Sequence, residues 1–226
     1  MESLSIPLAL IDLLPVILSG LGMFLIARLI TRLDRNCGHL ASLGFLLVTL
    51  GGLFNTLWKL ILVTTELHSP VLKHSLLILL APGFVLMAWA IWKTFHSGPS
   101  GTPVWVVPVI LIVVGCGAAA ISALSKGGQR WFFILLGLMT IGHATTSFLL
   151  AWQARRRGLR PVAALFLVSF GLVFLQAGTA WMLRQMVAMS WLEPIIHTLG
   201  WATFAYAAWQ LEQAMIQKHL SVVGSR

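Results

Sequence analysis

Residues 104–124 read Val-Trp-Val-Val-Pro-Val-Ile-Leu-Ile-Val-Val-Gly-Cys-Gly-Ala-Ala-Ala-Ile-Ser-Ala-Leu, and none of these side chains is charged. A helix needs about 20 apolar residues to cross the hydrocarbon core of a bilayer. The stretch meets that length and therefore predicts a transmembrane helix. Its small residues at 115–123 also predict close packing against neighbouring helices, because small side chains let helix backbones approach one another.

Apolar runs of similar length occur on both sides of this stretch, at 7–29, 40–65, 72–95, 131–153, 161–183 and 191–213. The whole chain of 226 residues is 58% hydrophobic and 9% charged. Soluble domains carry about 25% charged residues, so a soluble fold is excluded. The sequence predicts an all-α polytopic membrane protein with seven transmembrane helices in a single domain, 1–226.

The positive charges indicate how these helices are oriented. With the N-terminus outside, ten lysines and arginines fall at cytoplasmic ends of the runs and four at outer ends. Such a bias marks the cytoplasmic side. We read the net charge of +9 as topology rather than as a nucleic-acid surface, and expect the bacterial cytoplasmic (inner) membrane. The basic cluster at the end of the fifth run is expected to bind anionic membrane lipids: Arg155, Arg156, Arg157 and Arg160.

Short matches between the two halves predict an internal repeat. Residues 47–51 resemble 167–171, residues 56–60 resemble 179–183, and residues 72–76 resemble 195–199. The last two matches share an offset of 123 residues, whereas the first needs a shift of three. We therefore expect a repeat A at 7–95 and a repeat B at 131–213, joined by the helix at 104–124. Two parallel repeats imply a pseudo-two-fold axis along the membrane normal.

This three-plus-one-plus-three plan is similar to that of the SWEET and PQ-loop sugar transporters. The resemblance is one of topology, because neither half contains a Pro-Gln pair. It implies a solute site between the two repeats.

Polar side chains inside the apolar runs are the first candidates for a site, because ionisable groups in a bilayer are costly and mark solute or ion pathways. Lys59 lies inside the second run and needs a partner, for which Asp12 and Glu66 are the candidates. Asn55 and Gln176 lie at similar depths in the two repeats. The leading hypothesis is a transporter or permease-like protein for a small solute or ion, with Asp12, Asn55, Lys59 and Gln176 along its path.

Histidines and carboxylates near the predicted outer face support an alternative. His74 and His197 occupy matching repeat positions and could ligate haem, or could join Glu66, His68 and Glu193 around a divalent metal. The protein would then be a membrane redox subunit or a metal-dependent hydrolase. Hydrolases of the ceramidase and progestin-receptor-like group also combine seven helices with metal-binding histidines, but they need a histidine where this chain has Glu193.

A purely structural interpretation also remains open. The polar groups would then only join helices to one another, and His143 in the fifth run would donate an interhelical hydrogen bond. In that case the chain could be a scaffold that binds other membrane subunits.

Overall fold

The computed structural model describes residues 11–65, 70–96, 103–125, 129–182 and 192–223. These residues form seven helices, and each coincides with one of the predicted apolar runs. The prediction of an all-helical chain is therefore confirmed. The helices are α2 (Leu13–Leu33), α3 (Arg35–Thr65), α4 (Pro70–His96), α5 (Val106–Leu124), α6 (Arg130–Arg156), α7 (Arg160–Met182) and α8 (Leu192–Val223).

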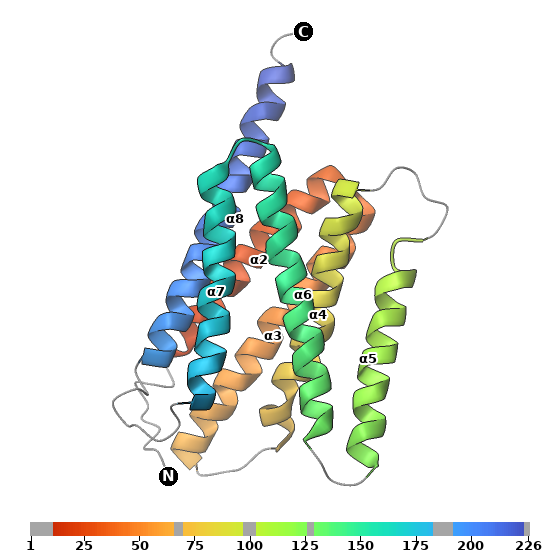
Figure 1. The fold of residues 1–226 in the computed structure, drawn as a ribbon, viewed down its shortest axis with the longest axis vertical. Coiled ribbons are helices and arrows are strands. Elements are labelled where there is room, and N and C mark those ends of the chain that lie inside the picture. Colours follow the sequence, from red (N-terminus) through yellow and green to blue (C-terminus); the bar gives the residue numbers. More distant parts are fainter. Residues whose placement is uncertain (1–10, 66–69, 97–102, 126–128, 183–191, 224–226) are drawn as a thin grey trace.

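Successive helices run in opposite directions, so the chain crosses the bundle from end to end (Figure 1). Five helices in the described residues are long and apolar enough to cross a membrane: Leu13–Leu33, Arg35–Thr65, His74–His96, Val106–Leu124 and Arg130–Arg156. This finding is compatible with an integral membrane protein. We refer to the end where α2 begins as the predicted outer end and to the opposite end as the predicted inner end.

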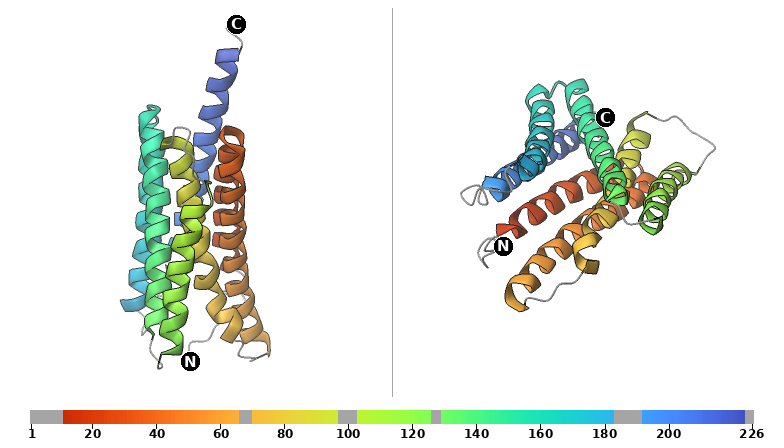
Figure 2. Two further views of the ribbon diagram at one scale, coloured as in Figure 1. Left: turned by 90° about the vertical axis from the view of Figure 1, so that its right-hand side faces the viewer. Right: turned by 60° about the horizontal axis from the view of Figure 1, so that its bottom comes forward.

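Six of the helices form a ring, in the order α2, α3, α4, α6, α7, α8 and back to α2. The remaining helix, α5, lies outside this ring and packs mainly on α6 (Figure 2). Much of α5 is exposed: a Cβ atom on Gly117 would meet nothing within 4 Å. The predicted tight packing holds for one face of this helix only: a Cβ atom on Gly115 would lie 2.7 Å from Leu138 of α6 and Ala119 is buried, whereas Ala118 and Ala120 are exposed.

Two glycines allow the closest approaches between the first three helices and the last three. A Cβ atom on Gly142 of α6 would lie 2.9 Å from the Cβ of Phe84 on α4. A Cβ atom on Gly22 of α2 would lie 2.6 Å from the ring of Phe204 on α8 and 3.1 Å from the Cα of Ala205. Real Cβ atoms do not approach so closely, so both contacts require glycine.

Large apolar side chains fill the space inside the ring. Phe84, Phe166, Phe204, Met23 and Leu150 are almost completely buried. The polar residues described next lie among them.

Candidate functional site

An ion pair joins the first two helices near the predicted outer end. Asp12 immediately precedes α2, and its carboxylate accepts a hydrogen bond from the ammonium group of Lys59 on α3. The side chains are 16% and 28% exposed, respectively. The structure thus brings together two residues that the sequence proposed as partners, because Lys59 would otherwise be an isolated charge inside an apolar helix.

His197 of α8 lies close enough to this pair for the charges of both Asp12 and Lys59 to act on its imidazole. Its Nε2 atom accepts a hydrogen bond of 2.9 Å from the indole N–H of Trp201, one turn further along α8. An acceptor Nε2 carries no proton, so the ring proton is on Nδ1. Asp12, Lys59 and His197 will be called the outer polar group.

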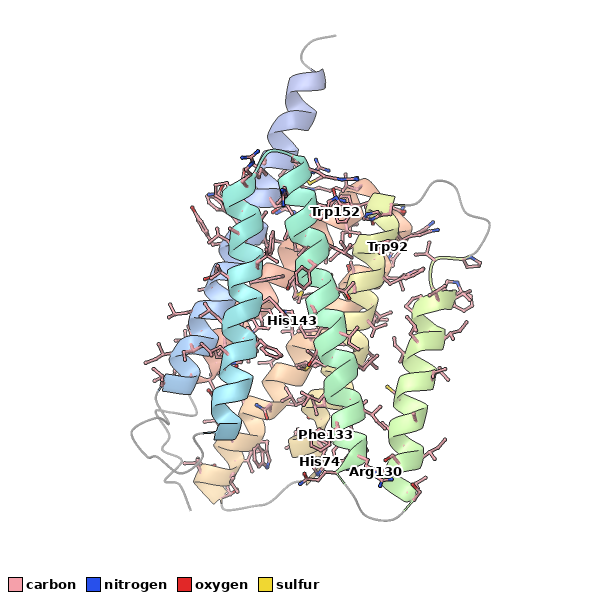
Figure 3. The ribbon with its side chains drawn as sticks, in the orientation of Figure 1. His74, Trp92, Arg130, Phe133, His143 and Trp152 are labelled. Carbon is pink, nitrogen blue, oxygen red and sulfur yellow. The ribbon has the colours of Figure 1, made fainter. Side chains whose placement is uncertain are left out.

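His143 of α6 lies deeper, about midway along the bundle (Figure 3). Its ring stacks on Trp201 of α8 at 5.4 Å between centroids, and Phe84 of α4 and Phe170 of α7 pack against it at 4.9 and 5.4 Å. Four helices therefore enclose one imidazole, which is only 4% exposed. His197 lies near enough to His143 for a charge on one imidazole to act on the other.

Three buried polar atoms near this ring have no hydrogen-bond partner among the described residues: Nε2 of His143, Oγ1 of Thr146 and Oγ of Ser147. The three residues share one face of α6, because positions i, i+3 and i+4 are neighbours on a helix. We call them the α6 polar cluster. The Nε2 of His143 therefore makes no interhelical hydrogen bond to the described residues, and aromatic rings pack against its imidazole.

A buried carboxylate lies toward the predicted inner end of α8. Oε1 of Glu212 is 3.6 Å from Nε of Arg28 and 3.6 Å from Nη1 of Arg32, both on α2. Both arginine side chains are about half exposed, whereas Glu212 is buried. The charge of Glu212 is therefore compensated by two cations at the end of the neighbouring helix.

The other residues proposed from the sequence are more scattered. Asn55 on α3 and Gln176 on α7 are both partly buried. His74 is exposed, and its ring packs edge-on against Trp131 at the start of α6, at the predicted outer end. No ring contact or hydrogen bond that the structure describes joins His74 to His197. Glu66 and His68 lie outside the described residues, as does the side chain of Glu193.

The described residues contain no group of three His, Cys, Asp or Glu side chains close enough to hold a metal ion. The ligand set that combined His74 and His197 with Glu66, His68 and Glu193 therefore lies partly outside the described residues. Of its two described histidines, His74 packs on Trp131 of α6, whereas His197 accepts a hydrogen bond from Trp201 of its own helix.

The sequence did not identify most of the residues that surround His143. Thr146 and Ser147 stand out beside His143 in the fifth run, and their spacing continues the face of α6 that begins with His143. Phe84, Phe170 and Trp201 gave no such signal, because aromatic residues are frequent in every apolar run. Glu212 could have been noticed as an acidic residue near a predicted inner end rich in arginine.

In comparisons with known proteins, no protein-family model, curated protein or solved structure matches the chain.

Proposed function

We propose that this protein is a membrane transporter or permease-like protein that moves a small solute or ion through the interior of its six-helix ring. The observation that carries the proposal is a line of polar groups from different helices. It begins at the outer polar group, passes Trp201 and reaches the α6 polar cluster. We call this line the polar axis.

The unpartnered atoms of the α6 polar cluster are the groups on the polar axis that can bind water or a polar solute. A buried donor or acceptor without a partner costs about 1–3 kcal/mol. Three such atoms on one helix face would together be costly if left unpaired, and water or a polar solute satisfies each of them. Thr146 and Ser147 supply hydroxyl groups, which can both donate and accept. His143 supplies an imidazole, which in its neutral form donates at one ring nitrogen and accepts at the other.

The charges at the outer end suit the entrance of such a path. Asp12 and Lys59 neutralise each other while they are paired, which lowers the cost of keeping both partly buried. A solute or ion that separates them would find a carboxylate on one side and an ammonium group on the other. His197 lies beside both and could relay a proton between this pair and the interior.

The arrangement of the helices supports a site between two related halves. Gly22 faces Phe204 where α2 meets α8, and Gly142 faces Phe84 where α6 meets α4. Gly142 follows Gly22 by 120 positions in the sequence, and Phe204 follows Phe84 by the same 120 positions. The two contacts between halves thus use the same residue types at one offset, which is also the offset between 47–51 and 167–171. We propose that 7–95 and 131–213 are parallel repeats, and that the polar axis runs between them.

We further propose that the chain spans the membrane seven times with its N-terminus outside, in a bacterial cytoplasmic membrane. The clustering of arginines at one end of the ring supports this orientation. Lipids at that end and other membrane subunits are the expected macromolecular neighbours.

The haem, metal and hydrolase alternatives have less support. His74 packs on Trp131 of α6, while His197 accepts a hydrogen bond from Trp201 of α8. The described contacts of the two imidazoles are therefore separate. None of the described contacts of these histidines favours a shared ligand over separate structural roles.

Replacing His143 by phenylalanine separates transport from a structural role. Phe fits a cage of aromatic rings and removes the unpartnered Nε2, so His143→Phe should preserve or increase thermal stability. If the axis conducts, the same change should reduce flux strongly. Gly137→Ala on the same helix is the matched control, because the added methyl group would meet nothing within 4 Å.

Flux is measured in proteoliposomes with two kinds of probe. Pyranine inside the vesicles reports proton entry under a potassium diffusion potential, and light scattering reports the entry of glycerol, urea and potassium chloride. We expect the native protein and Gly137→Ala to raise at least one of these rates above that of protein-free vesicles, and His143→Phe to lose the increase. Rates equal to those of protein-free vesicles for every probe would contradict the proposal, as would full flux in His143→Phe.

A further inference from the structure

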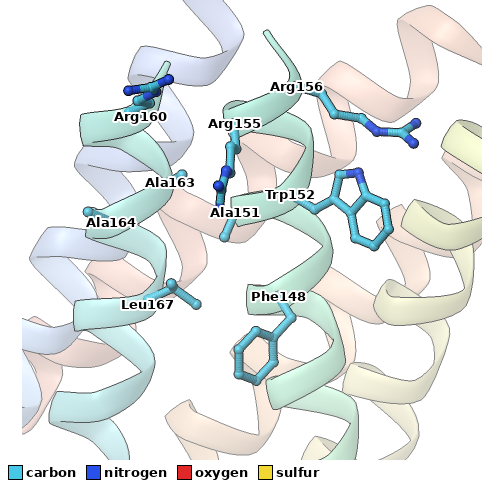
Figure 4. A pocket seen from close by; sticks show the side chains of 9 residues that line it. All are labelled: Phe148, Ala151, Trp152, Arg155, Arg156, Arg160, Ala163, Ala164 and Leu167. Carbon is cyan, nitrogen blue, oxygen red and sulfur yellow. The ribbon is translucent and has the colours of Figure 1, made fainter. Parts of the chain in front are cut away.

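A groove opens between α6 and α7 at the predicted inner end, away from the polar axis (Figure 4). Its volume is about 950 Å³, within the range of ligand-binding clefts. The residues that line it combine arginines with apolar and small side chains: Phe148, Ala151, Trp152, Arg155, Arg156, Arg160, Ala163, Ala164 and Leu167.

The connection between the two helices builds the mouth of this groove. Backbone hydrogen bonds close the end of α6: the N–H groups of Arg157 and Leu159 both donate to the carbonyl of Ala154, and that of Gly158 donates to the carbonyl of Arg155. Gly158 has a φ of 81°, a conformation that favours glycine and turns the chain back at once. The end of α6 and the beginning of α7 therefore lie side by side. Alanines at 151, 163 and 164 then leave space between them that larger side chains would fill.

The charge of the groove is entirely positive. Arg155 and Arg160 extend from the facing helices at its mouth (Figure 4), and no acidic residue lines it. The guanidinium of Arg156 is instead stacked over Trp152 at 5.0 Å, and that of Arg157 lies over Phe95 at 5.9 Å. The beginning of α7 adds the positive end of a helix dipole. Among the arginines that line the groove, Arg155 and Arg160 have no ring contact with the residues that the structure describes, so both can meet an anion.

The lower part of the groove is apolar. Phe148 and Leu167 are 55% and 42% exposed, and Ala164 is exposed between them. Trp152, an aromatic residue of the type found where hydrocarbon meets headgroups, lies beside the arginines. An occupant should therefore have an anionic head and a long apolar tail.

We propose that this groove binds one anionic phospholipid, with its phosphate between Arg155 and Arg160 and an acyl chain along Phe148, Ala164 and Leu167. A guanidinium can donate two parallel hydrogen bonds to a phosphate. In a zwitterionic lipid the headgroup's own cation partly neutralises that phosphate, so the two arginines should favour an anionic lipid. The inference does not depend on the transport proposal, because the groove and the polar axis lie on different faces of α6.

Native mass spectrometry of the intact protein, released from detergent micelles that contain phosphatidylglycerol or phosphatidylcholine, tests this site. We expect one phosphatidylglycerol to stay bound at concentrations that leave no phosphatidylcholine bound. Arg160→Gln should weaken retention about tenfold or more, since it removes a charge-assisted interaction. Ala164→Trp should weaken it as well, without any change in charge, by filling the groove.

Arg35→Gln is the matched control, because it removes one charge from the same predicted face, at the start of α3. It should retain the lipid as the native protein does. Equal retention of phosphatidylcholine, or an equal loss in Arg35→Gln and Arg160→Gln, would overturn the proposal. Unchanged retention in both groove variants would do so too.

Discussion

Replacing Gly142 by alanine should destabilise the protein, although alanine is the better helix former. The new methyl group would lie 2.9 Å from the Cβ of Phe84, 3.0 Å from its carbonyl carbon and 3.2 Å from the backbone nitrogen of Val85. Carbon atoms prefer separations of about 3.5–4.0 Å. Since two of these contacts are with backbone atoms, a change of rotamer cannot relieve them, and α4 and α6 must move apart.

The size of the effect follows from two opposing contributions. Overpacking costs about 1–3 kcal/mol, whereas replacing a helical glycine by alanine contributes up to about 1 kcal/mol of stability. Gly137→Ala, five residues earlier on α6, should gain only the second contribution. The two variants should thus differ by about 1–3 kcal/mol in free energy of unfolding. In a chain of this length, each kcal/mol shifts the melting temperature by about 2–4 °C.

Thermal unfolding in detergent, followed by circular dichroism, measures this difference. Gly142→Ala should unfold several degrees below Gly137→Ala, and Gly22→Ala should also unfold below it, because its new methyl group would meet Phe204 and the Cα of Ala205. A Gly142→Ala protein as stable as Gly137→Ala would refute the reasoning that these glycines set the distance between the two halves.

Three further predictions concern the charged groups. Asp12→Asn or Lys59→Met alone should destabilise by about 1–3 kcal/mol in chemical unfolding, and the double variant by less than the sum, because a single change leaves one partly buried charge unpaired. Glu212→Gln should leave the fold intact, but should raise the reactivity of the arginines of α2 toward phenylglyoxal. Burial raises the pKa of Asp34, but its hydrogen bonds from Cys37 and from a backbone amide outweigh that effect and lower the pKa below the usual 3.8. This carboxylate therefore stabilises the fold above about pH 4, and its contribution is lost as the pH falls further, so Asp34→Asn should weaken the acid dependence of the melting temperature.

The number and positions of the helices could be predicted because run length alone determines whether a helix can span a bilayer. An acidic partner for Lys59 could be predicted for a similar reason, because a lysine inside an apolar helix needs a counter-charge, but the choice between Asp12 and Glu66 stayed open. Both inferences require only the position of a residue along the chain, not the direction in which its side chain points.

The neighbours of each helix could not be predicted in this way. A soluble helix shows its buried face through an apolar stripe, whereas a helix surrounded by lipid is apolar all round. The rotation of α5, whose Ala119 is buried while Ala118 and Ala120 are exposed, could therefore not be predicted, and neither could that of α6, whose His143 ring stacks on Trp201. The repeat likewise suggested that His74 and His197 act together, but only His197 lies beside the ion pair.

Cysteine accessibility at Ser147 tests most directly whether water or solute reaches the centre of the ring. Cys37 and Cys116 would first be replaced by serine and alanine. Ser147→Cys and Leu150→Cys would then be compared, since both positions are fully buried on α6 and only the first belongs to the α6 polar cluster. In vesicles treated with a small water-soluble methanethiosulfonate, we expect Ser147→Cys to react and Leu150→Cys to stay inert. Equal protection of both thiols would mean that the interior of the ring stays dry, contrary to the proposed path.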